Sequence, residues 1–371
     1  MNIREGGLLG QVAPARRGSR RWSALPGLLM ILAIIAVLLS GVLSALKTTD
    51  YIETPAPAEA IDTHVTVAGH PPRPGRGSLY ITFIYQQQAS VLSKFWNQHF
   101  NPNASVYSSL QLFGPVTPPT QQQQQQTSAI DMIGSKNTAS IAAFSALGYH
   151  ALVKVKTAVG FIAPSSKANG LLQVQDIIVS LDGRAVADPA SLHAVEEGLK
   201  LKPGAVVTVV IKRGDPTGAG GTTMTFHIPT IALKGRAILG IDLAEAYTPY
   251  HLPYKVSIDS GDIGGPSAGL MFALSIYNRL SPVDITHGHK IAGTGTIAVN
   301  GVVGPIGGVH QKIIGAAESG AQYFFVPAYC HPEEHAIGDC NKEEAKPYPP
   351  SITVVPVNTL QEALTYLKRL K

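Results

Sequence analysis

Two short strings in the last third of the chain place a serine and a lysine at the starts of two expected helices. They are Gly264-Gly265-Pro266-Ser267-Ala268-Gly269 and Gly307-Gly308-Val309-His310-Gln311-Lys312. Each string joins small residues to an apolar stretch with helical spacing, which predicts a glycine-rich turn that leads into a helix. The two strings therefore predict that Ser267 and Lys312 each lie close to the N-terminus of a helix.

Ser267 is a candidate nucleophile because of its position at a helix start. Pro266 suits the first helical position, where its missing N–H would have no partner anyway. The free N–H groups of the first turn can stabilise the oxyanion of an acyl-transfer intermediate. Gly265 and Ala268 are small enough to let a peptide backbone approach. The alternative is a serine that only caps the helix.

Lys312 is a candidate base that follows a predicted hairpin. Residues 291–299 are rich in strand-forming residues, Asn300-Gly301 is a strong hairpin signal, and residues 302–306 can return as the partner strand. The helix that carries Lys312 then ends near Gly320. Burial beside apolar neighbours would lower the pKa of the lysine, and a neutral amine can accept the serine proton. The alternative is an ordinary surface lysine.

The segment from 236 to 369 resembles the proteolytic domain of the Lon family of serine proteases. The resemblance rests on Pro266-Ser267-Ala268-Gly269, on the run from Pro305 to Lys312, and on Thr294-Gly295-Thr296-Ile297 between them. It implies a Ser–Lys dyad with Ser267 as nucleophile and Lys312 as general base. It also implies that Thr294 hydrogen-bonds the lysine amine.

The resemblance further implies that the Ser267 N–H helps to hold the oxyanion, with Gly265, Pro266 and Ala268 as supporting residues. Many Lon proteases have an acidic residue three positions before the serine. Here that position is Gly264 and the nearest acid is Asp262, so the role of Asp262 stays open.

The basic charge of the chain is concentrated at its N-terminus. The formal net charge is +5; residues 1–22 hold five arginines and one glutamate, a net +4, which leaves +1 for the remainder. This distribution argues against a nucleic-acid partner.

The uncharged run 23–46 is long enough to cross a bilayer as a helix. We expect a single-pass anchor in the bacterial cell membrane, with residues 1–22 as a cytoplasmic tail and the catalytic domain extracellular. A cleaved signal peptide is the alternative, although Leu43 is bulky where a small residue is preferred.

The region between anchor and protease domain holds two expected parts. Residues 47–150 predict a linker, from 47 to 58, and an α/β region with a mobile glutamine-rich loop from Pro115 to Gln126. Residues 151–231 resemble a PDZ domain of bacterial proteases, on the run from Gly170 to Gly183, an expected helix from Pro189 to Leu199 and an expected strand from Val206 to Ile211. The resemblance implies peptide binding, with Gly160, Phe161 and Ile162 in the candidate carboxylate-binding loop. A PDZ fold used only as a spacer is the alternative.

The remaining motifs exclude several other chemistries. His331-Pro332-Glu333-Glu334-His335 fits a zinc-peptidase pattern, but the proline inside it disfavours the helix that this pattern needs, so we expect no metal. No Gly-x-x-x-x-Gly-Lys-Ser/Thr string occurs, which predicts no nucleotide and no other cofactor. Cys330 and Cys340 lie ten positions apart and can form a disulfide outside the cell, or remain two thiols.

The sequence thus predicts an α+β multidomain protein: a transmembrane helix, a PDZ-type β-sandwich or barrel with helices, and a Lon-type α/β proteolytic domain. The predicted function is an ATP-independent serine endopeptidase that cleaves protein or peptide substrates, which the PDZ domain could present. A homo-oligomer is compatible with this prediction. The alternative function is a membrane-tethered peptide-binding module whose protease domain is inactive.

Overall fold

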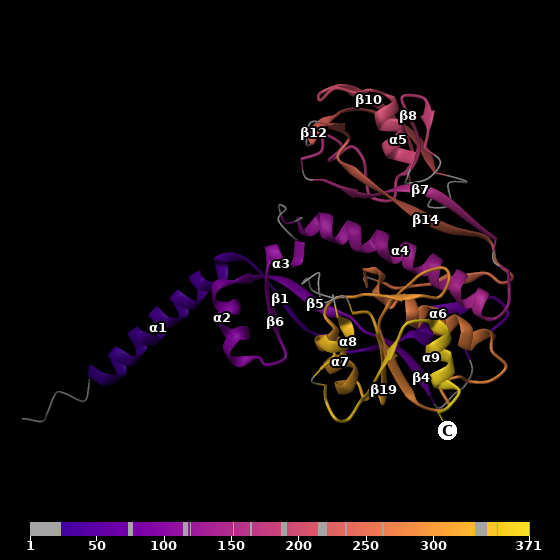
Figure 1. The fold of residues 1–371 in the computed structure, drawn as a ribbon. Coiled ribbons are helices and arrows are strands. Elements are labelled where there is room, and N and C mark those ends of the chain that lie inside the picture. The colour runs from indigo at the N-terminus through magenta and orange to yellow at the C-terminus, as the bar shows by residue number, and fades with distance from the viewer. Residues whose placement is uncertain are drawn as a thin grey trace, which may run out of the picture.

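The computed structural model describes residues 24–370 except 73–76, 114–117, 119, 151, 164, 187–190, 214–220, 234–235, 262, 331–339 and 347. Three parts are visible in Figure 1: a helix that projects from the body, an upper β-rich unit, and a lower α/β unit that contains the C-terminus. Helix α4 lies between the upper and lower units. The mixture of helices and sheets agrees with the predicted α+β class.

Helix α1 (Ala24–Ala45) is the projecting element, and its apolar side chains are exposed along its length. Within it, Pro26–Ala45 is long and apolar enough to cross a membrane. An apolar helix that no protein surface covers is expected to seek a nonpolar environment. The length and the composition of α1 are therefore those expected for a membrane anchor.

The first sheet follows α1 directly, and the expected linker is absent. Strand β1 (Lys47–Pro55) lies between β5 (Ile84–Ser90) and β6 (Ser105–Ser108), antiparallel to both. The linker prediction for 47–58 was wrong because these pairings come from distant strands and leave no strong local pattern. Helices α2 (Val91–Phe100) and α3 (Ser109–Phe113) flank this sheet.

Helix α4 (Gln121–Ala146) corrects a second expectation. The glutamine run from Gln121 was expected to be a mobile loop, but it forms the first turns of this helix. Glutamine has a good intrinsic helix propensity, and the packed second half of the helix supplies a nucleus from which the run can extend. The second half contributes Met132, Ala139 and Phe144 to the core of the lower unit.

The upper unit is a sheet in the order β11-β10-β8-β7-β14 with one helix. Its core contains Val159, Leu181 and Ile211. The expected strand at 206–211 and helix at 189–199 are confirmed as β10 and α5. The elements of this unit are β7 (Leu152–Ile162), β8 (Ile177–Leu181), β9 (Arg184–Ala185), α5 (Ser191–Gly198), β10 (Val206–Arg213), β11 (Thr222–Pro229), β12 (Ile231–Leu233), β13 (Arg236–Ile238) and β14 (Ile241–His251).

The lower unit is built on a sheet in the order β2-β4-β16-β19-β20, parallel except for β2. Helix α6 (Gly269–Leu280) is buried along most of its length, and its side chains Leu270, Phe272 and Leu274 form the centre of the core. The sheet consists of β2 (Glu59–Ala60), β4 (Ser78–Ile81), β16 (Lys290–Gly293), β19 (Tyr323–Pro327) and β20 (Thr353–Val357).

Several smaller elements complete this unit. The hairpin predicted at Asn300-Gly301 is confirmed: Gly301 has φ 83° and joins two short antiparallel strands. The other elements are η1 (Ile61–Thr63), β3 (Val65–Val67), β15 (Val256–Ile258), η2 (Pro266–Ala268), β17 (Thr296–Ile297), β18 (Val303–Gly304), α7 (Val309–Glu318), α8 (Asn341–Glu344) and α9 (Leu360–Leu367).

Candidate active site

The serine turn has the form that the sequence predicted. Ser267 is half-buried in the single 3-10 turn η2, which runs directly into α6. Gly265 precedes the turn with φ 85°, a backbone conformation that L side chains rarely adopt. Pro266 occupies the start of the turn. The glycine bends the chain, and the proline then sets the helical direction for Ser267.

Helix α4 holds this turn from the side. The Gly265 N–H donates to the Ser128 carbonyl oxygen at 2.7 Å, and the Ser135 hydroxyl donates to the Pro266 carbonyl oxygen at 3.0 Å. Ser128 and Ser135 lie two helical turns apart and therefore share one face of α4. The Gly265 N–H is thus engaged within the protein, and the role of the Ser267 N–H as oxyanion donor stays a prediction. No motif marked either serine of α4.

Lys312 meets Ser267 inside the protein. Its Nζ lies 2.9 Å from Ser267 Oγ, and the lysine is 4% exposed. Burial lowers the pKa of Lys312 to about 8, although the nearby Glu53 carboxylate acts in the opposite direction. Lys312 also lies in the first turn of α7, where the helix dipole disfavours a cation. The alternative of an ordinary surface lysine is therefore wrong.

Thr294 connects the lysine to the serine turn. Lys312 Nζ lies 3.3 Å from Thr294 Oγ1, and the threonine hydroxyl donates to the Ser267 carbonyl oxygen at 3.1 Å. Thr294 is fully buried, so water does not compete for these bonds. Gly295 follows with φ 153°, and its N–H donates to the same Ser267 oxygen at 2.7 Å. The three residues that the motifs predicted are therefore brought together.

The sequence analysis missed a buried carboxylate near the lysine. Glu53, on β1, is 3% exposed, and burial raises its pKa. Its Oε1 accepts a hydrogen bond of 2.8 Å from Gln86, while its Oε2 is buried and has no hydrogen-bond partner among the described residues. No sequence signal marks it, since it lies in the segment taken as a linker, far along the chain from Lys312.

The predicted peptide-binding residues of the upper unit lie in a strand, not in a loop. Gly160, Phe161 and Ile162 belong to β7, which pairs with β14 over nearly its whole length. In that register Phe161 lies opposite Asp242, and Ile162 lies opposite Ile241. Strand β8 occupies the other side of β7. The side of residues 160–162 that faces β14 is therefore already paired, whereas β8 pairs with β7 only at Ala158.

The other predicted site residues have different outcomes. The structure joins Cys330 and Cys340 in a disulfide. Asp262 and the stretch from His331 to His335 lie outside the described residues. Across the described residues, no group of three or more histidine, cysteine, aspartate or glutamate side chains could hold a metal ion.

Comparison with known proteins finds two domain families in the chain. Residues 251–367 match the family described as Lon protease C-terminal proteolytic domain, and residues 131–228 match the PDZ domain family. Lon protease 2 of Bacillus subtilis is 43% identical over 65 residues, which are 18% of this chain and 11% of that protein. Lon protease 1 of Sorangium cellulosum is 36% identical over 107 residues, or 29% of this chain and 12% of the relative.

A longer match has a lower sequence identity. Lon protease of Metamycoplasma arthritidis is 27% identical over 182 residues, which are 42% of this chain and 21% of that protein. The PDZ domain of the SdrC-like protein from Listeria monocytogenes covers 24% of this chain and 87% of its own, at 23% identity and a TM-score of 0.20. The chain thus spans about a fifth or less of the length of these curated Lon relatives.

Proposed function

We propose that the chain is a serine endopeptidase with a Ser–Lys dyad, because residues 251–367 match the Lon protease C-terminal proteolytic domain family and residues 131–228 match the PDZ domain family. Ser267 is the nucleophile and Lys312 is the general base. The 2.9 Å approach of Lys312 Nζ to Ser267 Oγ in a water-poor setting is the observation that carries this proposal. Proteins and peptides are the substrates.

The reaction proceeds through an acyl-enzyme. Neutral Lys312 takes the proton of Ser267 as Oγ attacks the carbonyl carbon of the scissile bond. The Ser267 N–H, at the start of the helical turn, stabilises the oxyanion that forms. The ammonium then gives its proton to the leaving amine and the C–N bond breaks. Water deprotonated by Lys312 hydrolyses the ester and restores Ser267.

Thr294 orients the base in this scheme. Its hydroxyl donates to the Ser267 carbonyl oxygen, so its oxygen presents lone pairs to the lysine amine. The amine is thereby held with its own lone pair free for Ser267. Because the amine and the threonine are both buried, their relative geometry does not depend on solvent.

We also propose that α1 is a single-pass anchor that leaves the protease domain on the outer face of a bacterial membrane. Its length, its exposed apolar surface and the arginines of residues 1–22 support this topology. We propose that cleavage needs no ATP, since the sequence has no phosphate-binding loop. Cleavage that uses no ATP favours unfolded or flexible substrates.

The test uses the full chain in lipid nanodiscs, with a chelator present and no nucleotide. Ser267→Ala and Lys312→Met should each abolish cleavage of an unfolded protein substrate. Lys290→Met, which changes an exposed lysine of β16, serves as the matched control and should cleave normally. Cleavage by Lys312→Met at the wild-type rate would exclude the dyad, and loss of wild-type cleavage in chelator would indicate a metallopeptidase.

A further inference from the structure

Helix α2 has an inverted distribution of polar and apolar side chains. Its half-buried positions are Leu92, Ser93, Lys94 and Asn97, whereas its other large apolar side chains point outward. The exposed fractions are 40% for Val91, 52% for Phe95, 59% for Trp96 and 59% for Phe100. A surface helix normally buries its apolar stripe and exposes its polar one. An exposed aromatic face of this kind indicates a partner outside the chain.

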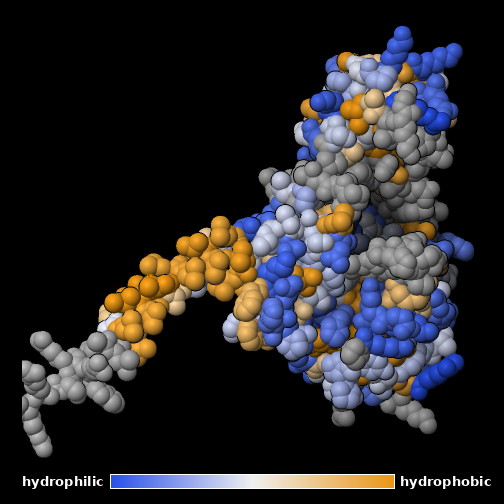
Figure 2. All heavy atoms as spheres, turned by 60° about the vertical axis from the view of Figure 1, so that its left-hand side comes forward, coloured by the Kyte–Doolittle hydropathy of each residue, from blue (hydrophilic) through white to orange (hydrophobic). Residues whose placement is uncertain are grey.

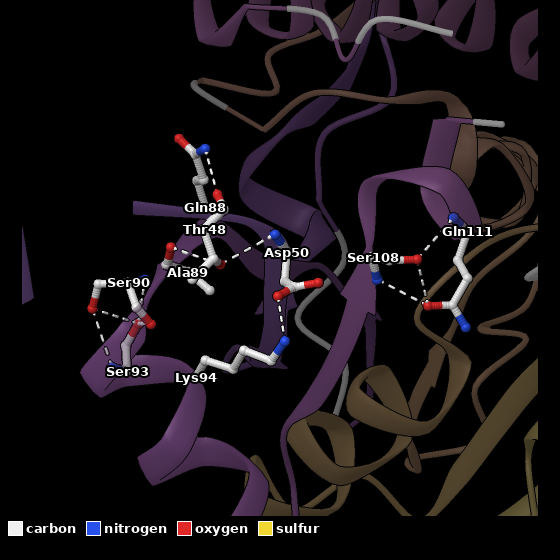
Figure 3. A network of polar contacts seen from close by, with 9 residues as sticks. All are labelled: Thr48, Asp50, Gln88, Ala89, Ser90, Ser93, Lys94, Ser108 and Gln111. Carbon is white, nitrogen blue, oxygen red and sulfur yellow. Dashed lines mark hydrogen bonds and ion pairs between the residues drawn. The ribbon is translucent and has the colours of Figure 1, made fainter. Parts of the chain in front are cut away.

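The orientation of α2 is held by polar contacts with the neighbouring sheet. Lys94 forms an ion pair with Asp50 of β1, as Figure 3 shows. Ser90 and Ser93 form a capping box that fixes the first turn. These contacts turn the polar side of α2 towards β1 and therefore keep the aromatic side away from the protein.

The position of α2 identifies the partner. The Val91 N–H donates to the carbonyl oxygen of Leu46, the residue that follows α1, so α2 begins where the expected membrane span ends. Figure 1 shows α1 and α2 leaving the same junction. Figure 2 shows hydrophobic surface beside the base of the exposed α1. Tryptophan and other aromatic side chains favour the boundary between lipid headgroups and acyl chains.

We propose that Phe95, Trp96 and Phe100 of α2 bind the outer interface of the same bilayer that α1 crosses. This proposal rests on the membrane anchoring stated above. Docking of a second helix beside the anchor would restrict the tilt of the protease domain relative to the membrane. With one helix as the single attachment, the domain could tilt about the end of that helix. It would also add apolar burial to that supplied by α1.

The test uses full-length protein in nanodiscs and the fluorescence of Trp96. The chain has two tryptophans, so Trp22→Phe leaves Trp96 as the only one. We expect lipids brominated near the headgroup to quench Trp96 by at least half. The matched control adds Trp96→Phe and Tyr348→Trp, which places the probe on an exposed site far along the chain and should show no quenching.

Flotation with the nanodisc lipids is measured on the same samples. Protein that fails to float refutes the anchor itself. Protein that floats while Trp96 shows no lipid quenching refutes the role of α2. If Trp96 is also shielded from acrylamide in that case, a second copy or another protein covers the face instead of lipid.

A separate observation concerns the buried Glu53 carboxylate of β1. A Cβ atom on Gly308 would lie 3.5 Å from Glu53 Oε2, so this oxygen faces the N-terminus of α7. Lys312 follows Gly308 by one helical turn, and its N–H donates to the Gly308 carbonyl oxygen. The partnerless oxygen therefore faces the turn of α7 that carries the base.

We propose that Glu53 is a positioning residue that acts as a buried counter-ion and stabilises the ammonium formed when Lys312 takes the Ser267 proton. This proposal rests on the proposed dyad. The groups that face the carboxylate are Gln86 of β5, which donates to it, Lys312 of α7, Tyr107 of β6 and Glu344 of α8. Lys312 is the cation among these groups, so proton transfer to its amine creates an opposite charge beside Glu53.

The proposal predicts two opposite effects in Glu53→Gln. Loss of the negative charge disfavours the ammonium, so the acidic limb of the acylation rate should move down by about one pH unit. The high-pH plateau should fall about tenfold, because the ammonium in the transition state loses its counter-ion. The two pH profiles should therefore converge or cross at low pH. Glu318→Gln, the same change at an exposed glutamate of α7, is the matched control and should leave the midpoint unchanged.

The titration of Lys312 is also followed directly, by NMR of the lysine Cε in the inactive Ser267→Ala background. An unchanged lysine midpoint in Glu53→Gln would refute the proposal, as would a uniform loss of rate at every pH. Should Glu53→Gln fail to fold, Glu53→Met fills similar space without a polar group and replaces it in both measurements. If the wild-type rate does not depend on Lys312, the dyad itself is refuted, whatever the NMR result.

Discussion

Replacement of Lys312 by methionine should stabilise the protein at neutral pH and remove its activity. Methionine keeps the length of the side chain and removes the buried amine. The pKa of Lys312 is about 8 in the folded protein, against 10.5 for a lysine in water. This difference of about 2.5 pH units corresponds to about 3 kcal/mol of free energy of unfolding, because each unit is worth about 1.4 kcal/mol.

The direction of the effect follows from proton binding. Between pH 8 and 10.5 the unfolded chain still binds the lysine proton that the folded protein has released, so wild-type stability rises with pH in that window. Below pH 8 both states are protonated and the whole cost of the buried ammonium is present. The stability advantage of Lys312→Met over wild type should therefore shrink by about 2.5 kcal/mol from pH 7 to pH 10.

Urea unfolding followed by far-ultraviolet circular dichroism, at several pH values, measures this difference. Lys290→Met is the control, because its lysine is exposed and its removal should give a difference that does not vary with pH. The comparison between two pH values cancels any packing gain of the methionine itself. A difference for Lys312→Met that stays constant from pH 7 to pH 10 would show that the lysine is not held in a charge-disfavouring site.

Three further results are expected. The acylation rate of the wild type should rise with pH around a midpoint near 8 and reach about a tenth of its plateau at pH 7, measured by stopped flow; a flat profile from pH 6 to 9 contradicts a lysine base. Thr294→Val should lower kcat about tenfold with little change in KM, since it removes a buried hydrogen bond to the amine; an effect on KM alone would assign Thr294 to substrate binding. Deletion of residues 151–231 should raise KM for a protein substrate and spare a small peptide; equal losses for both would make this region a support for the protease domain.

The Ser–Lys geometry was predictable because its determinants are local. The turn at Ser267 depends on the glycine and the proline directly before it, and the hairpin at Asn300-Gly301 determines how the chain returns to the lysine helix. Each signal lies within a few residues of the feature that it specifies. The order of elements in the upper unit was predictable for the same reason.

The missed features depend on contacts between distant segments. Strand β1 is specified by its partners β5 and β6, and Glu53 reaches Lys312 only through that pairing. Ser135 and Pro266 are 131 positions apart, so a helix that seemed peripheral in the sequence holds the serine turn. Contacts between segments so far apart cannot be predicted from the local sequence. The glutamine run was mispredicted for a different reason. Its low complexity was taken to indicate a loop, although glutamine has a good helix propensity and the run is helical.

Acylation of Ser267 by an activated peptide ester tests the central claim most directly. Intact-mass spectrometry of the full-length protein in nanodiscs, followed by peptide mapping, locates the acyl group and its rate of formation. The dyad predicts one acyl group, on Ser267, in the wild type at pH 8, and at least a hundredfold slower acylation in Lys312→Met. An acyl group on another residue, or an unchanged rate in Lys312→Met, would contradict it.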